Sequence, residues 1–561
     1  MSRLWPLMPT LLWALLITIG TPSLHAQQAL PEQFDLRVHA VHNPVTAVKS
    51  QQGGTCWTHG TMAALESNLL ITGVWDSLLT TGDETEHAPN LAEYHLDWWN
   101  GFNAFYNEDT PGQHLGLEIH MGGDYRVASA YISRGEGVVR DTDGQNFDEA
   151  PMRRNTRFHY FYPRDIEWYS AGAEGEQRDL LKEKIMEHGV MATCLYYNAS
   201  FIDSNYCHYQ PPSDHHEPNH SVAIIGWDDT RETQAPLPGA WLVKNSWSQG
   251  WGHQGYFWIA YGDKWTGRHP EMGAVSFLHT EPMQYDHVYY HDYHGWRDTL
   301  TTAVQGFNAF TATQDESLEA VSFYTAADSV DFTLAVYSQF AEGELAGLNS
   351  TQTGFIRHSG FHTVTLDEAP ALAEGQRFFL YLSLSAGGQA IDRSSIVPVL
   401  LGATGSSQFV PSTAAPGQSY IMTAQGWADL YDAYQPDNAD WSQTANLCIK
   451  GLTKRQTPTT VNNGAESSVT AFSLGQNYPN PFNPTTTIPC RIAASCRVQV
   501  VVYSSLGQVV RQLYHNETAA GTLLLEWDGC LDNGMPAASG MYFIKMTSAQ
   551  HSTVRKVLLL R

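Results

Sequence analysis

Two kinds of hydrophobic pattern divide the chain. Met62, Leu65 and Leu69 lie three and four positions apart, which predicts a helix with one buried stripe. Gly73 can close this helix. A second helix and three short apolar strands follow, at 179–188, 221–226, 241–244 and 256–261. This mixture of helices and strands predicts an α+β domain over residues 27–284.

Further along the chain the hydrophobic period changes to two. Apolar residues alternate with polar ones at 331–336 and 379–384, which predicts a β-sandwich over residues 285–454. The stretch 455–470 is rich in Thr, Asn, Gln and Ser without apolar periodicity, and it is interpreted as a linker. Alternation returns in residues 471–561, where a second, smaller β-sandwich is expected. The predicted fold is therefore an α+β domain followed by two all-β sandwich domains.

The first 26 residues have the features of a signal peptide. Arg3 gives a positive start, residues 11–19 form a short apolar core, and Ala26 supplies the small residue that cleavage requires. The alternative is a membrane anchor, but this apolar core is far shorter than the roughly 20 residues of a spanning helix. No later segment is long enough to span either. We therefore expect an exported protein that is secreted or displayed on the cell surface, without a transmembrane segment.

Composition narrows the classes of partner. The chain has 57 acidic and 31 basic residues, a net charge of −26, so its surface should repel nucleic acid and anionic lipid. Aromatic residues make up 12% of the 561 residues, which is typical of a folded chain. Seven cysteines would meet an oxidising compartment, and the odd number leaves at least one unpaired within the chain.

Three residues suggest chemistry when they are taken together. Cys56 directly precedes the predicted helix, where the helix dipole and a neighbouring imidazolium can lower the pKa of a thiol. A lone cysteine is more often a small buried residue or half of a disulfide. However, His220 begins one predicted strand and Asn245 follows the next, and the order Cys, His, Asn suits acyl transfer to a thiol.

With these residues in this order, the chain resembles the papain family of cysteine peptidases over about residues 30–280. The blocks that carry the resemblance are Leu30-Pro31, Asp35-Leu36-Arg37, Val48 to Gln51, Cys56-Trp57, Met121 to Asp124, His220 and Asn245-Ser246-Trp247. The resemblance implies a papain-like α+β catalytic domain that hydrolyses peptide bonds in protein or peptide substrates through a thioester, and it implies no cofactor or metal.

The resemblance also implies a role for each catalytic residue. The Cys56 thiolate attacks the carbonyl carbon, and His220 protonates the leaving amine and later activates water. The Asn245 side-chain carbonyl fixes the imidazole tautomer. The Gln51 amide and the Cys56 backbone N–H hold the oxyanion.

Three further residues are expected to line the substrate site. Gly122 and Gly123 resemble the glycine-rich wall along which a substrate strand pairs, and Trp247 resembles the indole that shields the His and Asn pair.

The chain departs from the family pattern in three places. Gln51 lies five residues before Cys56 where the family has six, so Gln52 is an alternative oxyanion donor. His59 is interpreted as a core histidine, with a second titrating group near the site as the alternative. Only a few residues separate Ala26 from the start of the papain-like region, so the long inhibitory propeptide of the family is expected to be missing and any latency must come from elsewhere.

Two other polar clusters could be functional, but each is interpreted as an ordinary structural feature. Asp214, His215, His216, Glu217 and His220 together resemble metal ligands, but the surrounding prolines mark a loop without the regular spacing of a zinc site, and no metal is predicted. The segment from His291 to His294 is interpreted as a polar strand edge.

The two trailing domains carry resemblances of their own. Residues 285–452 resemble the lectin-like β-sandwich of some bacterial papain-family peptidases, which would bind a glycan or only support the catalytic domain. The run Asn-Tyr-Pro-Asn-Pro-Phe-Asn-Pro at 477–484, with the C-terminal ending 556–561, resembles the sorting domain that the type IX secretion machinery reads. The function predicted is a secreted cysteine peptidase. The alternatives are a thiol amidase or acyltransferase on the same scaffold, and a catalytically silent surface adhesin.

Overall fold

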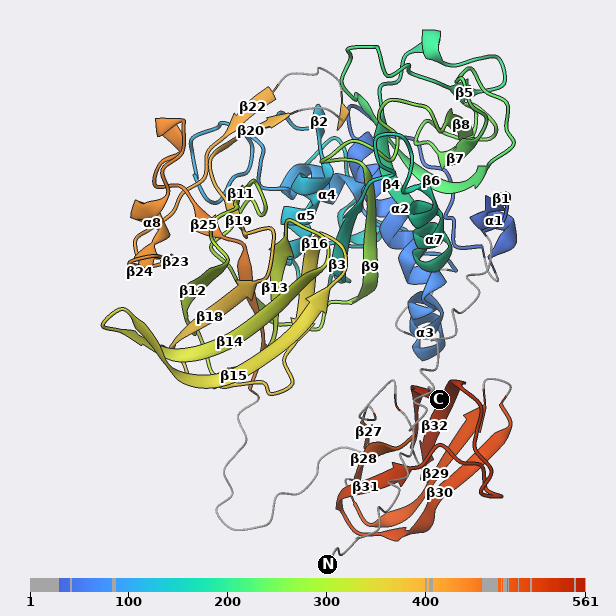
Figure 1. Ribbon diagram of the computed structural model, residues 1–561, viewed down its shortest axis with the longest axis vertical. Helices are drawn as coiled ribbons and strands as arrows, with labels where there is room; N and C mark the ends of the chain where they lie inside the picture. The colour runs from blue at the N-terminus through green and yellow to red at the C-terminus, as the bar shows by residue number, and fades with distance from the viewer. Residues whose placement is uncertain are drawn as a thin grey trace, which may run out of the picture. The chain divides into compact units, whose positions relative to one another are not determined.

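The computed structural model (Figure 1) describes residues 30–40, 43–82, 87–398, 401–402, 407–456, 473–475, 477, 482, 484–492, 494–504, 507–548 and 551–559. The predicted signal peptide and nearly all of the predicted linker lie outside these residues. The chain forms two compact units, Met1–Gln456 and Thr457–Arg561. Among the described residues, no helix combines the length and the apolar composition needed to cross a membrane.

The first part of the chain contains both helices and strands, as its sequence predicts. Its helices are α1 (Leu36–His39), α2 (Cys56–Ile71), α3 (Val74–Thr81), α4 (Glu93–Trp99), α5 (Tyr125–Ser133), α6 (Asp141–Gly144) and α7 (Arg178–His188). Its strands are β1 (Gln33–Asp35), β2 (Gly122–Gly123), β3 (Phe161–Tyr169), β4 (Met191–Leu195), β5 (Cys207–His208), β6 (His220–Asp228), β7 (Ala240–Lys244), β8 (Tyr256–Ala260) and β9 (Ala274–Pro282).

Helix α2 is the central helix of this part. Fourteen of its 16 residues are buried, so the prediction of one buried stripe is wrong. The reason is that α2 lies against β6 and β9 and also against α4 and α5. Gly60 permits the close approach of β6, because a Cβ there would lie 2.4 Å from the hydroxyl oxygen of Ser221. The helix that begins with Cys56 is therefore held on all sides.

The middle part is a β-sandwich, as predicted. Its elements are β10 (His287–Tyr289), β11 (Asp298–Leu300), β12 (Gln305–Thr311), β13 (Glu316–Thr325), β14 (Val330–Ala341), β15 (Glu344–Ile356), β16 (Gly360–Thr365), β17 (Ala371–Leu372), β18 (Arg377–Leu384), β19 (Gln389–Asp392), β20 (Ser395–Pro398), β21 (Leu401–Gly402), β22 (Ser407–Val410), β23 (Ser419–Thr423), β24 (Gly426–Asp429), α8 (Leu430–Ala433), β25 (Asn446–Leu447) and β26 (Ile449–Arg455). A six-stranded sheet in the order β15-β14-β18-β12-β23-β24 packs against β13 and β26 through a shared apolar core.

One sheet continues from the middle part into the first part. Its strand order is β10-β26-β13-β16-β3-β9-β4-β6-β7-β8-β5, and the junction is the antiparallel pair β16 and β3, in which Phe361 lies opposite Ile166. Figure 1 shows β13 and β16 beside β3 and β9. The two parts thus share backbone hydrogen bonds and an apolar core, so that the sandwich braces the sheet that carries His220.

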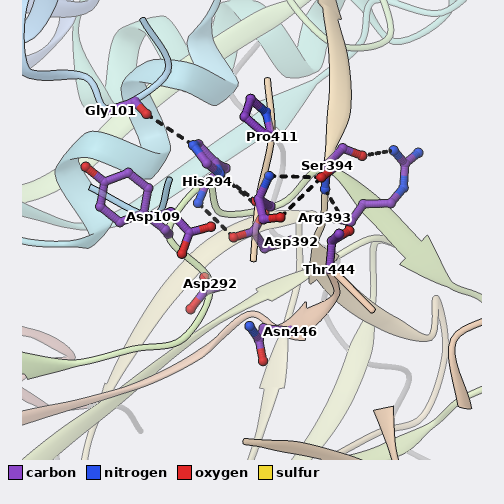
Figure 2. Close-up of polar contacts among 12 residues, drawn as sticks. Gly101, Asp109, Asp292, His294, Asp392, Arg393, Ser394, Pro411, Thr444 and Asn446 are labelled. Atoms are coloured by element: carbon purple, nitrogen blue, oxygen red, sulfur yellow. Dashed lines mark hydrogen bonds and ion pairs between the residues drawn. The ribbon is translucent and has the colours of Figure 1, made fainter. Parts of the chain in front are cut away.

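A buried polar cluster also joins the two parts, and Figure 2 shows it. The imidazole of His294 has both ring nitrogens in contact: Nδ1 lies 2.6 Å from the hydroxyl oxygen of Ser412, and Nε2 lies 3.1 Å from the carbonyl oxygen of Gly101. The Ser412 hydroxyl oxygen lies 2.8 Å from the carboxyl group of Asp392, and the backbone N–H of His294 donates to the same carboxyl group at 2.9 Å. The cluster therefore links the loop around Gly101 to β19 and to the segment that follows β22.

The interpretation of His291 to His294 as a polar strand edge is wrong for this reason. Asp292 and His294 are 0% and 1% exposed, and Lys450 of β26 forms an ion pair with Asp292 inside the protein. Residues 291–294 lie between β10 and β11 and form no strand, and contacts with Lys450 of β26, Gly101 and Asp392 hold Asp292 and His294 inside the protein.

The C-terminal unit is a second, smaller β-sandwich, as predicted. Its strands are β27 (Ser473–Leu474), β28 (Thr486–Ile492), β29 (Cys496–Ser504), β30 (Val509–Thr518), β31 (Gly521–Trp527), β32 (Gly540–Thr547) and β33 (Ser552–Leu559). They form a sheet in the order β27-β28-β31 and another in the order β30-β29-β32-β33, which share one apolar core around the fully buried Trp527. All seven cysteines of the chain lie in described residues and are free thiols.

Candidate active site

Cys56 is the first residue of α2 and follows a tight loop. Gly53 has a φ of +62°, and a Cβ at this position would lie 2.8 Å from the carbonyl oxygen of His120, so the turn requires glycine. The next residue, Gly54, donates its N–H to the same carbonyl group at 2.6 Å. The thiol of Cys56 is 1% exposed and sits at the positive end of the helix dipole.

His220 and Asn245 come from neighbouring antiparallel strands. His220 is the first residue of β6, and Asn245 directly follows β7. The ring nitrogen Nε2 of His220 donates to the side-chain oxygen Oδ1 of Asn245 at 2.8 Å. Because Oδ1 is an acceptor only, this contact fixes the proton on Nε2 and leaves Nδ1 as the basic nitrogen of a neutral ring.

Trp247 covers the imidazole of His220. Its ring is stacked on that of His220 with centroids 4.4 Å apart and 26° between the planes. The rings of Tyr197 and Trp251 meet Trp247 edge-on, at 4.6 and 5.1 Å. The indole is thus fixed over the hydrogen bond between His220 and Asn245, where it limits access of water.

An open pocket of about 180 Å³ brings most of the predicted site together. Its lining consists of Gln51, Gly53, Gly54, Cys56, Tyr197, Asn219, His220 and Trp247. Gln52, the alternative oxyanion donor, does not line this pocket, and its backbone N–H donates to the hydroxyl of Tyr94 at 3.2 Å. Asn245 lies behind His220 rather than in the pocket wall.

The side chain of Gln51 is held at both ends of its amide. Nε2 donates to the carbonyl oxygen of Gly53 at 2.9 Å, and Oε1 accepts from the hydroxyl of Ser246 at 2.6 Å. The amide is therefore positioned beside the loop that precedes Cys56.

Sequence reasoning missed Tyr197 and Asn219. The two are clamped together, because the N–H of Tyr197 donates to Oδ1 of Asn219 at 2.7 Å and Nδ2 of Asn219 donates to the carbonyl oxygen of Tyr197 at 3.1 Å. The position of Asn219 directly before His220 was a usable signal, whereas nothing beside Tyr197 in the sequence marks it as part of a site.

Burial strongly shifts the pKa values of Cys56 and His220 when each group is considered alone. Desolvation raises the pKa of the Cys56 thiol to about 12, although the N–H groups of Ser221 and Trp57 act in the opposite direction. Desolvation also lowers the pKa of His220 to about 4. Both shifts favour a neutral pair and oppose the thiolate that the sequence predicts. Attraction between a thiolate and an imidazolium, which strengthens in the same low dielectric, opposes both shifts.

A buried ionic cluster lies beneath the catalytic residues. Lys49 forms ion pairs with Glu66 at 2.7 Å and with Glu93 at 2.6 Å. Lys244, which directly precedes Asn245, donates to the hydroxyl of Thr46 at 3.0 Å, and burial lowers its pKa to about 8. A cavity of about 20 Å³ adjoins this cluster and Asn245, room for one water molecule.

His59 lines that same small cavity. Its Nδ1 lies 2.9 Å from the carbonyl oxygen of Thr55, and burial lowers the pKa of its ring. These observations favour the interpretation of His59 as a neutral core histidine.

Gly122 and Gly123 form β2 but do not line the pocket. A Cβ at Gly123 would lie 2.7 Å from the indole of Trp57, so only glycine fits there. Their backbone is paired antiparallel with β21, Gly122 opposite Gly402 and Gly123 opposite Leu401. The glycine pair that the sequence assigns to a substrate is therefore paired with another strand of the same chain, β21.

The acidic and histidine-rich loop before β6 is held by its own contacts. Asp214 lies 2.9 Å from Nδ1 of His216 and accepts from Gln210 at 2.7 Å. Among the described residues no group of three or more His, Cys, Asp or Glu side chains is placed to share a metal ion.

Comparisons with known proteins agree with this geometry. The papain family cysteine protease profile matches residues 120–275, a lectin-like domain profile matches 288–453, and an Ig-like domain profile named after FlgD matches 490–552. The chain contains a papain-family cysteine protease domain followed by a lectin-like domain. The matched protease region includes His220 and Asn245, whereas Cys56 lies before it.

Individual relatives give the same picture. Bovine pro-cathepsin H is 28% identical over 234 residues, and cysteine proteinase 2 of maize is 26% identical over 249 residues. These matches cover 40% and 43% of the chain, and the chain spans 59% of the length of either relative.

Two solved structures of the clostridial cysteine protease Cwp84 share the fold. One, of a cysteine-to-alanine variant after propeptide cleavage, has a TM-score of 0.58 and 21% identity, and covers 73% of this chain and 97% of its own. The other holds the protease and lectin-like domains of Cwp84, a surface layer associated protein of Clostridium difficile. It has a TM-score of 0.55 and 20% identity, and covers 76% of this chain and 91% of its own. The papain-like fold followed by a β-rich lectin-like part is thereby confirmed.

Proposed function

We propose that the chain is a secreted cysteine peptidase that uses Cys56, His220 and Asn245. The observation that carries the proposal is the hydrogen bond from Nε2 of His220 to Oδ1 of Asn245, in a pocket that Cys56 also lines. It supplies a nucleophile, a base with a fixed tautomer and an orienting amide in one place.

The reaction follows from the position of the protons. Nδ1 of His220 takes the thiol proton of Cys56, and the thiolate sulfur attacks the carbonyl carbon of the peptide. The C–N bond breaks as Nδ1 returns this proton to the departing amine. A thioester remains on Cys56, and water hydrolyses it after His220 removes a proton from that water. Cys56 and His220 thus end in their starting protonation states.

The oxyanion of each tetrahedral intermediate needs donors beside Cys56. The side-chain amide of Gln51 and the backbone N–H of Cys56 are the proposed pair, since both belong to the pocket wall. Gln51 supplies its Nε2 donor after leaving the carbonyl oxygen of Gly53. Trp247 keeps water from the bond between His220 and Asn245.

A digest of a peptide library tests the proposal. The full chain should cleave peptides, and Cys56→Ala should not. Asn245→Ala should retain part of the activity, because it disturbs the orientation of His220 and leaves the nucleophile and base in place. Cleavage by Cys56→Ala at the wild-type rate would reject the assignment.

The same digest separates the two alternatives. A thiol amidase or acyltransferase would release ammonia or transfer an acyl group from small amides without cutting peptides, since the triad activates any acyl carbon. A silent surface adhesin would do neither and would still react with iodoacetamide.

Export is proposed to use both ends of the chain. The signal peptide would direct transport across the inner membrane, and residues 472–561 would then be read by the type IX secretion machinery. The Pro and Asn run and the C-terminal ending support this role, and the Ig-like profile match at 490–552 agrees with the sandwich of this unit. Removal of residues 472–561 should trap an active peptidase in the periplasm. Normal amounts of the truncated enzyme at the cell surface would reject the sorting role.

For the lectin-like domain, the contacts support a bracing role. Its strands continue the sheet that carries His220, and its buried Asp392 belongs to the cluster around His294. Glycan binding stays a prediction that rests on the lectin-like profile match, and a glycan array with residues 30–456 would test it.

A further inference from the structure

We propose that β21 of the lectin-like domain is an intramolecular inhibitor, which occupies the backbone edge of Gly122 and Gly123 that a peptide substrate needs. The inference rests on the proposed function, because it concerns the regulation of the same site. It assigns any latency of the peptidase to a strand nearly 280 residues downstream of the glycine pair.

The pairing has the form expected of a bound substrate. The glycine pair runs antiparallel to β21, with Gly123 opposite Leu401 and Gly122 opposite Gly402. Backbone pairing of this kind depends little on side chains, which is how a sheet edge accepts an extended peptide. Since an edge can pair with only one strand at a time, β21 and a substrate strand exclude each other.

The position of the glycine pair is fixed on its other side. Gly123 lies flat on the indole of Trp57, where a Cβ would come within 2.7 Å of the ring. Trp57 is fully buried and directly follows Cys56. The edge therefore remains beside the nucleophile and does not turn away when its partner strand changes.

β21 also lies against the two elements that carry the reacting groups. It contacts α2, which begins with Cys56, and β6, which begins with His220. β21 therefore lies beside the elements that carry the nucleophile and the base. The short length of β21, only Leu401 and Gly402, makes it a weak competitor that a substrate can displace.

The test compares two double substitutions at the same positions. Leu401→Pro/Gly402→Pro removes both backbone N–H donors of β21, whereas Leu401→Ala/Gly402→Ala keeps them. Each is made in the wild-type chain, to measure hydrolysis of fluorescein-labelled casein, and in the Cys56→Ala chain, to measure casein binding by fluorescence anisotropy. Circular dichroism and the melting temperature establish that each variant is folded.

The proline variant should raise kcat/KM, chiefly through a lower KM, and tighten casein binding by about 5- to 30-fold, the range for losing one or two competing hydrogen bonds. The alanine variant should stay close to wild type. Binding and KM that do not change in a folded proline variant would overturn the inference while the proposed function stands. Tighter binding without any casein turnover, in wild type and variant alike, would support the inference and reject the proposed function.

A second variant guards against loss of folding. If the proline pair unfolds the chain, residues 400–403 are replaced by Gly-Ser-Gly-Ser, which weakens the strand through backbone entropy. The same two measurements then apply, and unchanged casein binding again overturns the inference.

Discussion

Two buried histidines of this protein have similar partners and different environments. His220 and His294 are 4% and 1% exposed, and each contacts a polar side chain. His294 even lies in a chain with the side chains of Ser412 and Asp392, the residue types of a hydrolase triad. Yet His294 has both ring nitrogens engaged, whereas His220 uses Nε2 for Asn245 and faces a pocket that it shares with Cys56.

Access separates the two constellations further. The Ser412 hydroxyl is buried between the imidazole of His294 and the carboxyl group of Asp392, where no substrate reaches it. In the pocket, Asn245 cannot take a proton from His220, and the free nitrogen of the ring remains a base. Residue types alone therefore do not identify a catalytic site. A catalytic histidine is identified instead by a free ring nitrogen and by access for a substrate. Variants of the two clusters can test that difference.

Removal of the catalytic groups should have the largest effect. Cys56→Ala and His220→Ala should each lower kcat/KM by about 10³-fold or more, since the nucleophile and the base act as one unit. The matched control is Cys448→Ala, which removes another buried thiol from the lectin-like domain. A fluorogenic peptide found in the library digest gives the rates. Near-normal turnover in either catalytic variant would contradict the distinction between the two histidines.

The pH dependence of alkylation should distinguish burial from pairing. With His220 present, we expect iodoacetamide to label Cys56 near pH 6, because the imidazolium stabilises the thiolate. In His220→Ala only burial remains, which raises the thiol pKa, so labelling should move to high pH. Mass spectrometry of labelled peptides measures both profiles. Identical profiles, rising only above pH 8, would show that no ion pair exists.

His294→Ala should change stability rather than chemistry. It leaves Ser412 and the carbonyl oxygen of Gly101 without their imidazole partner, which should cost about 2 to 4 kcal/mol of unfolding free energy. The variant should keep the wild-type kcat/KM in its folded fraction. Urea unfolding of residues 30–456 and active-site titration with iodoacetamide measure the two quantities. A specific loss of kcat in a fully folded variant would place His294 in the catalytic machinery.

Much of the catalytic arrangement could be predicted because its signals are local. Cys56 precedes a helix, His220 starts a strand and Asn245 ends the next, and neighbouring strands bring the last two together. The helix at 179–188 and the three strands after it also form within two residues of the predicted bounds. In each case the hydrophobic period predicted the type of element, and the flanking residues predicted where it begins and ends.

The features that could not be predicted from the sequence depend on contacts between distant segments. The burial of nearly all of α2 follows from packing on both sides, and the pairing of Gly123 with Leu401 joins residues that share no pattern. The same holds for the His294 cluster, whose partners come from residues near 101, 392 and 412. Spacing along the chain showed polar residues at 291–294 but gave no sign that distant segments bury Asp292 and His294.

A further expected effect, on the pH dependence of stability, concerns Asp392, the acid of the His294 cluster. Burial, and next the charge of Asp109, raise the pKa of Asp392 from 3.8 to about 8. The folded protein therefore keeps this proton between about pH 4 and pH 8, while the unfolded chain loses it. The stability that the protonated group contributes is complete below pH 4 and decreases as the pH rises towards 8, by about 1.4 kcal/mol per pH unit.

Asp392→Asn replaces the protonated acid with a group that does not titrate. At pH 5 the variant should be less stable than wild type, because an amide reproduces the contacts with His294 and Ser412 only in part. At pH 8 wild type has lost most of the contribution of Asp392, so the difference should become smaller or reverse. Urea unfolding of both proteins at the two pH values measures this change. The contributions of the other titrating groups cancel in the difference between the two proteins. A difference that is the same at pH 5 and pH 8 would mean that Asp392 is ionised in the folded protein, and the cluster would then hold a buried negative charge beside His294.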